Sequence, residues 1–249
     1  NYQGIRCASR HRRGGLSGAM RRIAINQPNY VPWLGFFDLI NRVDVFVILD
    51  TVQYTKQDWR NRNRIKTGGG PKWLTIPIKV PLGTLIKEVR CNDLSWIPTH
   101  LRQIENAYRD APAYDEIMPL IRQWYRALGS LWLTDIDESL MRRVCDLLAI
   151  ETDWVRASEF NAIDDQTNRL VDLCRVTGAT HYVSGPAARA YLDTEAFARA
   201  GIEIEWMSYD YDFEYDQPHP PFLRGVSILD ALLCCGPERS GNLLRGSYG

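Results

Sequence analysis

The hydrophobic pattern is clearest between residues 23 and 50, where two apolar runs flank an amphipathic segment. Residues 23–26 are apolar up to a final asparagine, and residues 33–41 place apolar side chains at a helical spacing. Residues 43–50 form a nearly continuous β-branched run, which is typical of a parallel strand with both faces covered. The stretch therefore predicts a strand, a turn, a helix and a second strand, which together make a βαβ unit.

Helical spacing dominates the middle of the chain. Three amphipathic segments with charged outer faces fall between residues 98 and 150. From residue 152 to residue 236, strand-like and helical runs alternate, and the last helix is expected to begin at the N-cap residue Ser227 and to end at Gly236. The predicted fold class is α/β: a Rossmann-like core with a mainly parallel sheet and a helical insertion at about residues 98–150.

The domain boundaries follow from composition. Residues 20–239 contain no internal repeat and no linker, so we predict a single domain there, followed by a flexible C-terminus at 240–249. Residues 1–19 contain four arginines, no acidic residue and no apolar periodicity. We interpret them as a disordered basic tail or as translated sequence upstream of the true start, with a basic nucleic-acid arm as the alternative.

Charge and motif content exclude several classes of protein. The whole chain has zero net charge, so the part after residue 19 carries a net charge of −4, which argues against a nucleic-acid partner bound through its phosphates. No apolar run reaches the ~20 residues of a membrane helix, so we expect no membrane span and a cytoplasmic protein.

Specific chemical motifs are also lacking. The six cysteines and four histidines form no CxxC, HExxH or HxH pattern, so we predict reduced thiols and no metal site. No Walker loop, GxGxxG or nucleophile elbow occurs in the sequence, so no cofactor is predicted. The oligomeric state is left open.

The turn after the first strand is the first candidate binding element. Ligands of doubly wound folds lie beyond the carboxyl ends of the strands, which is where this turn and, after the next strand, Asp50 are expected. The helix that opens near Pro32 would offer free N–H groups to an anion, and Gly35 would let a ligand or a strand approach the backbone. The alternative is that the turn only covers the edge of the core. The candidate residues in the turn are Gln27, Pro28 and Tyr30.

The second candidate is the segment 53–66, which combines five basic residues with one acidic residue and several aromatic and amide side chains. We predict a polar loop that holds an anion, because guanidinium groups grip phosphate or carboxylate and aromatic rings stack on a base or a sugar. A solvated surface loop and a single-stranded nucleic-acid site are the alternatives. A strand is predicted only after the loop, near residues 72–80. The candidate residues are Gln53, Trp59, Arg60, Asn61, Arg62, Asn63 and Arg64.

The third candidate lies in the carboxyl-terminal half. Ser184 and Gly185 end a predicted strand and open a helix, so Ser184 is either a helix cap or a ligand contact. His181 lies inside that strand, where it is either a hydrogen-bonded core residue or a catalytic base.

Five motifs in this order resemble the WbqC-like protein family, over about residues 21–236. They are Q-P-x-Y-x-P-x-x-G-F-F from Gln27, D-x-V-Q-Y from Asp50, the R-N-R block, S-G-P from Ser184 and S-I-L-D-x-L from Ser227. The resemblance implies a bacterial protein encoded among polysaccharide or natural-product assembly genes. It further implies transfer of a glycyl or related acyl group onto an amino sugar in O-antigen synthesis.

The residues and the resemblance together lead to one hypothesis and one rival. The hypothesis is an acyl- or aminoacyltransferase acting on an amino-sugar nucleotide or a phosphorylated or acyl carrier, with Asp50 or His181 as the base. The rival is a non-catalytic module that binds a nucleotide-sugar or a carrier arm. Nucleotidyl transfer is a weaker third reading, because Trp33 and its neighbours replace both histidines of the nucleotidylyltransferase P-x-H-x-G-H turn.

Overall fold

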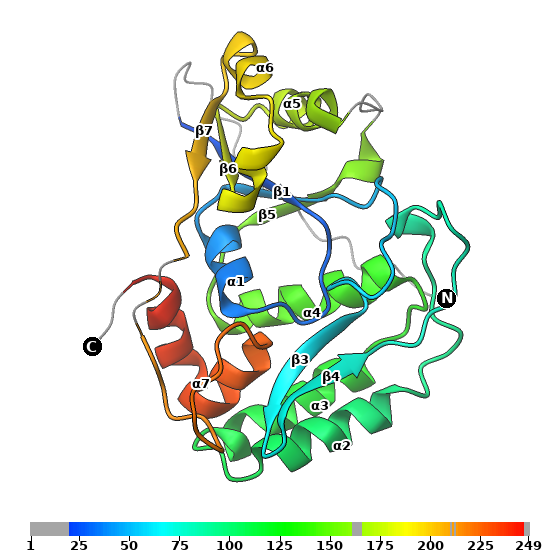
Figure 1. The fold of residues 1–249 in the computed structure, drawn as a ribbon, viewed down its shortest axis with the longest axis vertical. Helices are drawn as coiled ribbons and strands as arrows, with labels where there is room; N and C mark the ends of the chain where they lie inside the picture. The colour runs from blue at the N-terminus through cyan, green and yellow to red at the C-terminus, as the bar shows by residue number, and fades with distance from the viewer. Residues whose placement is uncertain (1–19, 161–165, 210, 212, 247–249) are drawn as a thin grey trace, which may run out of the picture.

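The computed structural model describes residues 20–160, 166–209, 211 and 213–246, so the predicted tail at 1–19 lies outside the described residues. Figure 1 shows a twisted sheet above a layer of helices, with a small hairpin beside that layer. In the described part of the chain, no helix combines the length and the apolarity needed to cross a bilayer.

The sheet has five parallel strands in the order β5-β2-β1-β6-β7. The chain runs outward from β1 in one direction through β2 and then returns to the other side of β1 at β6. This reversal is the topological switch point of a Rossmann-like fold, and it confirms the predicted fold class. The strands are β1 (Arg22–Asn26), β2 (Val45–Ile48), β5 (Asp153–Arg156), β6 (His181–Ser184) and β7 (Glu203–Trp206).

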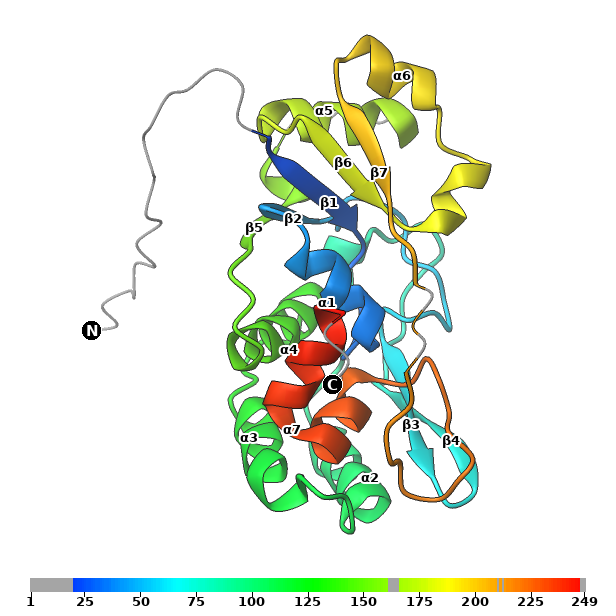
Figure 2. The same cartoon turned by 90° about the vertical axis from the view of Figure 1, so that its left-hand side faces the viewer.

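Both faces of the sheet are buried, which explains why β2 has no polar alternation. Ala24 and Phe46 face α1 (Leu34–Asn41) and the helical layer, whereas Ile23 and Val45 face the opposite side. Two helices, α5 (Gln166–Val176) and α6 (Thr194–Arg199), cover that opposite face. Figure 2 shows α5 and α6 beyond the sheet on one side and α1 between the sheet and the helical layer on the other.

Three helices follow one another in the segment 98–150, where a helical insertion was predicted. They are α2 (Ile97–Tyr108), α3 (Tyr114–Arg126) and α4 (Leu133–Leu147). Short 3₁₀ turns occur at η1 (Ile86–Glu88), η2 (Ala157–Glu159) and η3 (Pro186–Ala190). The three helices share one core with α1 and α7, so the insertion and the sheet are not separated by solvent.

The last helix, α7 (Ile228–Leu244), begins as predicted, because Ser227 is its N-cap and its side chain accepts from the Leu229 N–H at 3.3 Å. At Gly236 the backbone leaves the helical conformation with φ of +74°. A second helical segment then continues to Leu244, whose side chain is buried. The predicted helix end at Gly236 is therefore a kink, and the described part of 240–249 packs on the core.

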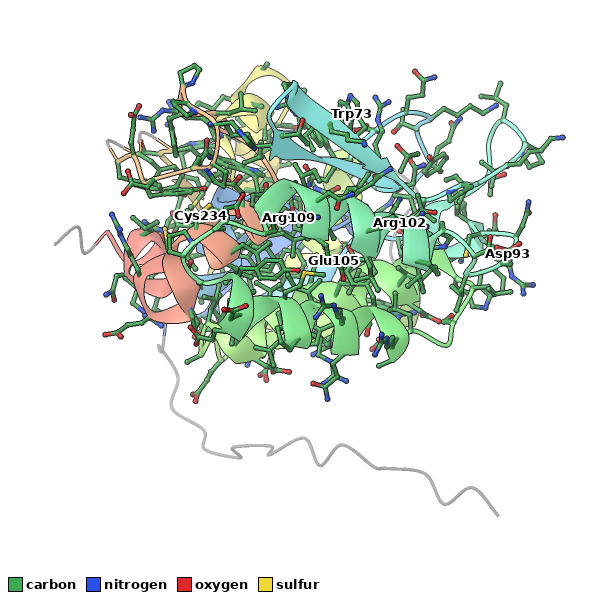
Figure 3. The ribbon with its side chains drawn as sticks, turned by 90° about the horizontal axis from the view of Figure 1, so that it is seen from below. Trp73, Asp93, Arg102, Glu105, Arg109 and Cys234 are labelled. Atoms are coloured by element: carbon green, nitrogen blue, oxygen red, sulfur yellow. The ribbon has the colours of Figure 1, made fainter. Side chains whose placement is uncertain are left out.

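An antiparallel hairpin of β3 (Arg62–Thr67) and β4 (Gly70–Thr75) crosses the helical layer. The sequence predicted a loop where β3 lies. Asn63 and Ile65 face inward and are buried, so Arg62 and Arg64 face outward by the period-two alternation of a strand. Trp73 pairs with Arg64 on this outer face, and Figure 3 shows Trp73 on the side of the hairpin turned away from α2.

Candidate functional site

The loop after β1 is held by three other parts of the chain. The Tyr30 N–H donates to the Trp59 carbonyl at 2.9 Å, and the Asn63 side-chain amide donates to the Tyr30 and Val31 carbonyls at 3.1 and 3.0 Å. The Ser227 hydroxyl donates to the Val31 carbonyl at 2.7 Å. Val31 has a left-handed φ of +36°, so the loop keeps a conformation that a free chain would disfavour.

Gly35 has a different role from the predicted approach of a ligand or a strand. A Cβ atom at this position would lie 2.3 Å from the Trp33 indole, so only glycine leaves room for that ring across the first turn of α1. The ring then meets Tyr209 edge-on at 5.1 Å between centroids. This packing explains the glycine two residues after Trp33.

Tyr30 points into the helical layer. Its hydroxyl lies 2.8 Å from His100 Nδ1 and 2.6 Å from the Tyr125 hydroxyl. Because His100 Nε2 faces the Thr75 carbonyl at 3.1 Å, Nε2 carries the proton and Nδ1 accepts from Tyr30. Burial lowers the pKa of His100 to about 4. Tyr30 is fully buried and therefore anchors the loop in the core.

A cleft of about 410 Å³ opens at the carboxyl ends of β1, β2 and β6. This is the switch point, where ligands of open α/β sheets bind. We call it the switch-point cleft. Its polar lining consists of Asn26, Gln27, Gln53, Arg169, Tyr182 and Tyr191.

Arg60 supports the floor of this cleft. Its Nε donates to Gln27 Oε1 at 2.5 Å, and a terminal nitrogen pairs with Asp58 at 2.8 Å. The bond from Arg60 to Gln27 Oε1 orients the amide, and its NH₂ group can donate to a ligand. Burial lowers the pKa of Arg60, and Asp58 opposes this shift. The cleft therefore presents an amide donor backed by a positive charge, which suits an anionic or carbonyl-bearing ligand.

Asp137 on α4 is a second carboxyl group near Arg60. It is fully buried, and neither oxygen has a hydrogen-bond partner among the described residues. Burial raises the pKa of Asp137 well above its ordinary value, and Arg60 opposes the shift. The carboxylate in ion-pair contact with Arg60 is that of Asp58.

Asp50 lies at the carboxyl end of β2, as predicted, but its side chain has a structural contact. It is 1% exposed and accepts from the N–H and the hydroxyl of Ser158 at 3.0 and 2.6 Å. These bonds join the end of β2 to η2, just after the neighbouring strand β5. Asp50 does not line the cleft, although Leu49 and Gln53 on either side of it do.

His181 lies at the amino-terminal ends of the parallel strands, opposite the cleft. It is the first residue of β6 and pairs with Arg22, the first residue of β1. Its Nε2 lies 3.2 Å from a Glu203 carboxylate oxygen, and its Nδ1 lies 2.8 Å from the Thr180 hydroxyl. Parallel strands all begin at one end of the sheet and finish at the other. His181 begins its strand and Asp50 follows the end of its strand, so the two residues are not brought together.

Ser184 and Gly185 lie at the carboxyl end of β6. Gly185 is the N-cap residue of η3, so Ser184 does not cap that turn. The Ser184 hydroxyl donates to the Tyr182 hydroxyl at 3.4 Å, and Tyr182 lines the cleft. Ser184 does not line the cleft itself but hydrogen-bonds Tyr182, which does.

The arginine-rich segment is divided between two places. Arg60 reaches Gln27, whereas Arg62 and Arg64 stack on the outer face of the hairpin, with Arg62 4.1 Å from the Trp73 ring and Arg64 5.5 Å from the Trp59 ring. Arg60 precedes β3, which begins at Arg62, so it does not share the outer face of that strand. The start of β3 therefore separates residues that the sequence predicted as one anion-binding wall.

The remaining predicted residues support the structure. Asn61 accepts from the Tyr54 hydroxyl at 2.8 Å and donates to the Ile76 carbonyl at 2.9 Å, Asn63 holds the loop, and Pro28 is buried. Sequence reasoning missed Arg169 and Tyr182 of the cleft. Arg169 lies near the start of α5, the helix that follows the carboxyl end of β5, and this position was the available signal. Tyr182 lies in the first half of β6, where position along the strand gave no such signal.

Comparison with known proteins gives two matches over most of the chain. The model of the WbqC-like protein family matches residues 27–241. The uncharacterized protein Rv1507c of Mycobacterium tuberculosis (strain ATCC 25618 / H37Rv) is 39% identical over 221 residues, which cover 88% of this chain and 96% of that protein. The family match includes the loop after β1, the hairpin, the helical layer and the last four strands of the sheet.

Proposed function

The chain belongs to the WbqC-like protein family, and from this premise we propose that it binds a nucleotide-activated amino sugar in the switch-point cleft and acylates the sugar's amine. The acyl group would be an aminoacyl group of glycyl type or a related one, and the product would enter a surface polysaccharide or a natural product made in a bacterial cytoplasm. The observation that carries the proposal is the Arg60–Gln27 contact at the floor of the cleft.

The lining of the cleft suits such a ligand. The Gln27 amide offers donors to a phosphate or carbonyl oxygen, and Arg169 lines the same cleft. Tyr182 and Tyr191 present aromatic rings, on which a sugar or a base packs favourably. A volume of about 410 Å³ falls in the range of small-molecule sites, although part of the ligand would remain in solvent.

The proposed reaction is amide formation. The amine nitrogen of the sugar attacks the carbonyl carbon of an acyl thioester or ester, and a C–N bond forms. The bond from that carbon to the carrier's sulfur or oxygen breaks, and the carrier leaves with the proton that the amine loses. We propose that Asp50 takes this proton from the amine and passes it to the departing carrier, which requires Asp50 to exchange Ser158 for the amine. We do not assign this role to His181, which lies at the amino-terminal ends of the strands.

Binding is tested by thermal shift and calorimetry with uridine and thymidine diphosphate amino sugars. We expect Arg169→Gln and Gln27→Ala to weaken binding by about tenfold, the loss expected for one charge-assisted hydrogen bond. Arg175→Gln is the matched control, because Arg175 lies on the same helix and pairs with Asp172 at the surface. Equal affinity of all variants for the amino-sugar nucleotides would show that the cleft is not the binding site.

The base is tested by comparing two variants that break the same contact. Asp50→Asn removes the carboxylate, whereas Ser158→Ala removes the hydroxyl and frees the Oδ2 atom of Asp50, while Oδ1 still accepts from the Ser158 N–H. A base role predicts that turnover falls at least a hundredfold in Asp50→Asn and persists in Ser158→Ala. A purely structural role predicts that both variants lose stability and turnover together.

A second candidate function is binding without catalysis. It is favoured by the hydrogen bonds of both Asp50 oxygens to Ser158. It is also favoured by the lining of the cleft, in which the described residues include no histidine or cysteine. Incubation with an amino-sugar nucleotide and an acyl thioester, followed by mass spectrometry, separates the two candidates. An acylated sugar supports the transferase, and stabilisation by the nucleotide without any product supports the binding module.

A further inference from the structure

A second pocket, of about 290 Å³, shares no lining residue with the switch-point cleft. The loop after β1 serves both sites: Gln27 lines the cleft, while Asn29, Pro32 and Trp33 line the second pocket. Trp59, Asn63, Arg64 and Gly225 complete it. We call it the hairpin pocket, because β3 and the residues just before it form one side.

Arg64 gives the hairpin pocket an available positive charge. Among the described residues, no carboxylate lies within ion-pair distance of its guanidinium. The group is placed by the rings of Trp59 and Trp73, at 5.5 and 5.7 Å, and by a long contact of 3.4 Å to the Gly225 carbonyl. Its Nε is buried without a hydrogen-bond partner among the described residues, so the charge that a ligand can meet lies on the terminal nitrogens.

An aromatic groove of about 430 Å³ adjoins the hairpin pocket, and Trp33 and Gly225 line both. The groove is lined mainly by the rings of Trp33, Tyr209, Tyr211, Phe213, Tyr215 and Phe222. The hydroxyls of Tyr211 and Tyr215 are turned away to the carboxylates of Asp38 and Asp230, at 2.7 and 2.8 Å. The rings therefore offer their apolar surface to the groove.

The charged end of Arg64 stands at the junction of the two cavities, since its terminal nitrogen contacts Gly225, which lines both. We propose that the hairpin pocket and the aromatic groove form one ligand site for a small molecule with an apolar body and a terminal anionic group. The body lies along the aromatic rings, and the anion meets the guanidinium of Arg64. This proposal stands on its own geometry and does not require the transferase activity.

The test uses defined probes and the intact protein. Tryptophan fluorescence is the readout, because Trp33 and Trp59 both line the site. Decanoate carries the body and a carboxylate, decyl phosphate carries the same body and a phosphate, decanol lacks the charge, and acetate and inorganic phosphate lack the body. We expect both charged decyl probes to bind at least tenfold more tightly than decanol, acetate or phosphate, and the tighter of the two identifies the natural anion.

Arg64→Gln and Arg62→Gln form the matched pair of variants. Both residues face outward on β3 and stack on Trp73, but only Arg64 lines the pocket. We expect Arg64→Gln to weaken the charged probes about tenfold, and Arg62→Gln to change their affinity less than twofold. Phe222→Ala should weaken the charged and the uncharged decyl probes alike, because Phe222 contacts only the body.

Thermal melting confirms that each variant is folded before its affinity is compared. Equal effects of the two arginine substitutions would overturn the proposal, because the charge would then act as a general surface field. Decanol binding as tightly as decanoate would overturn it as well. We expect that a nucleotide-sugar does not displace decanoate, because the two ligands bind different sites.

Discussion

Replacing Asn63 by alanine should destabilise the protein by about 3 kcal/mol, although the side chain is small and belongs to the β3–β4 hairpin. Its amide donates to the carbonyls of Tyr30 and Val31, and its Oδ1 accepts from the Arg64 N–H at 2.8 Å. The side chain is 2% exposed, so water cannot replace these bonds. At about 1 kcal/mol for each net hydrogen bond, three bonds give the expected loss.

The isosteric change Asn63→Asp separates the hydrogen bonds from the volume of the side chain. A carboxylate keeps the shape but places its oxygens against the two carbonyl oxygens, so it should cost at least as much as alanine at neutral pH. Asn106→Ala is the control, because Asn106 is exposed on α2 and only accepts from Arg109. The control should change stability by less than about 0.5 kcal/mol.

Urea unfolding followed by circular dichroism measures these differences. With a slope of roughly 3 kcal/mol/M, the Asn63→Ala midpoint should fall by about 1 M. A loss below about 1 kcal/mol, or a loss equal to that of Asn106→Ala, would refute the idea that Asn63 fixes the loop after β1. An Asn63→Asp variant as stable as the native protein would refute it more directly.

Two further predictions address the core of the loop. Gly35→Ala places a Cβ atom 2.3 Å from the Trp33 ring and should destabilise by about 1–3 kcal/mol in urea unfolding, whereas Gly129→Ala, with open space around it, should be neutral or slightly stabilising. Burial lowers the pKa of His100 from 6.5 to about 4, so the unfolded chain binds a proton in that window that the folded chain does not, and stability falls as pH falls. Between pH 7.5 and 4.5 the free energy of unfolding of the native protein should fall by up to about 2.5 kcal/mol more than that of His100→Gln. Urea unfolding at each pH measures this difference. The same pH dependence of stability in both proteins would contradict the prediction.

The sheet could be predicted because the sequence patterns that indicate its strands and helices are local. Strand β2 is apolar on both faces, the glycine after α5 ends that helix, and the order of elements leaves few topologies for a parallel sheet. Strand β3 was missed because it pairs only with β4 and turns asparagine inward, where the Asn63 amide binds loop carbonyls. A strand of arginine and asparagine has no hydrophobic alternation from which to predict it.

The candidate site was only partly predictable, for a related reason. Gln27 and Gln53 follow strands, and the rule for open α/β sheets places such residues at a ligand site. Whether a guanidinium joins them depends on where the neighbouring strand β3 begins. Arg60 lies before β3 and contacts Gln27, whereas Arg64 lies within β3 on the outer face of the hairpin. The bonds of Asp50 to Ser158, 108 residues away, have no local signal in sequence.

The bond from Ser227 to the Val31 carbonyl joins residues 196 positions apart. On the ribosome, at ~5–20 residues per second, the nascent loop would wait roughly 10–40 s for this last partner to be translated. Trp59 and Asn63, which also hold the loop, are translated much earlier. The loop is therefore held first by the segment around the hairpin, and its last hydrogen bond forms only after the start of α7 has been made.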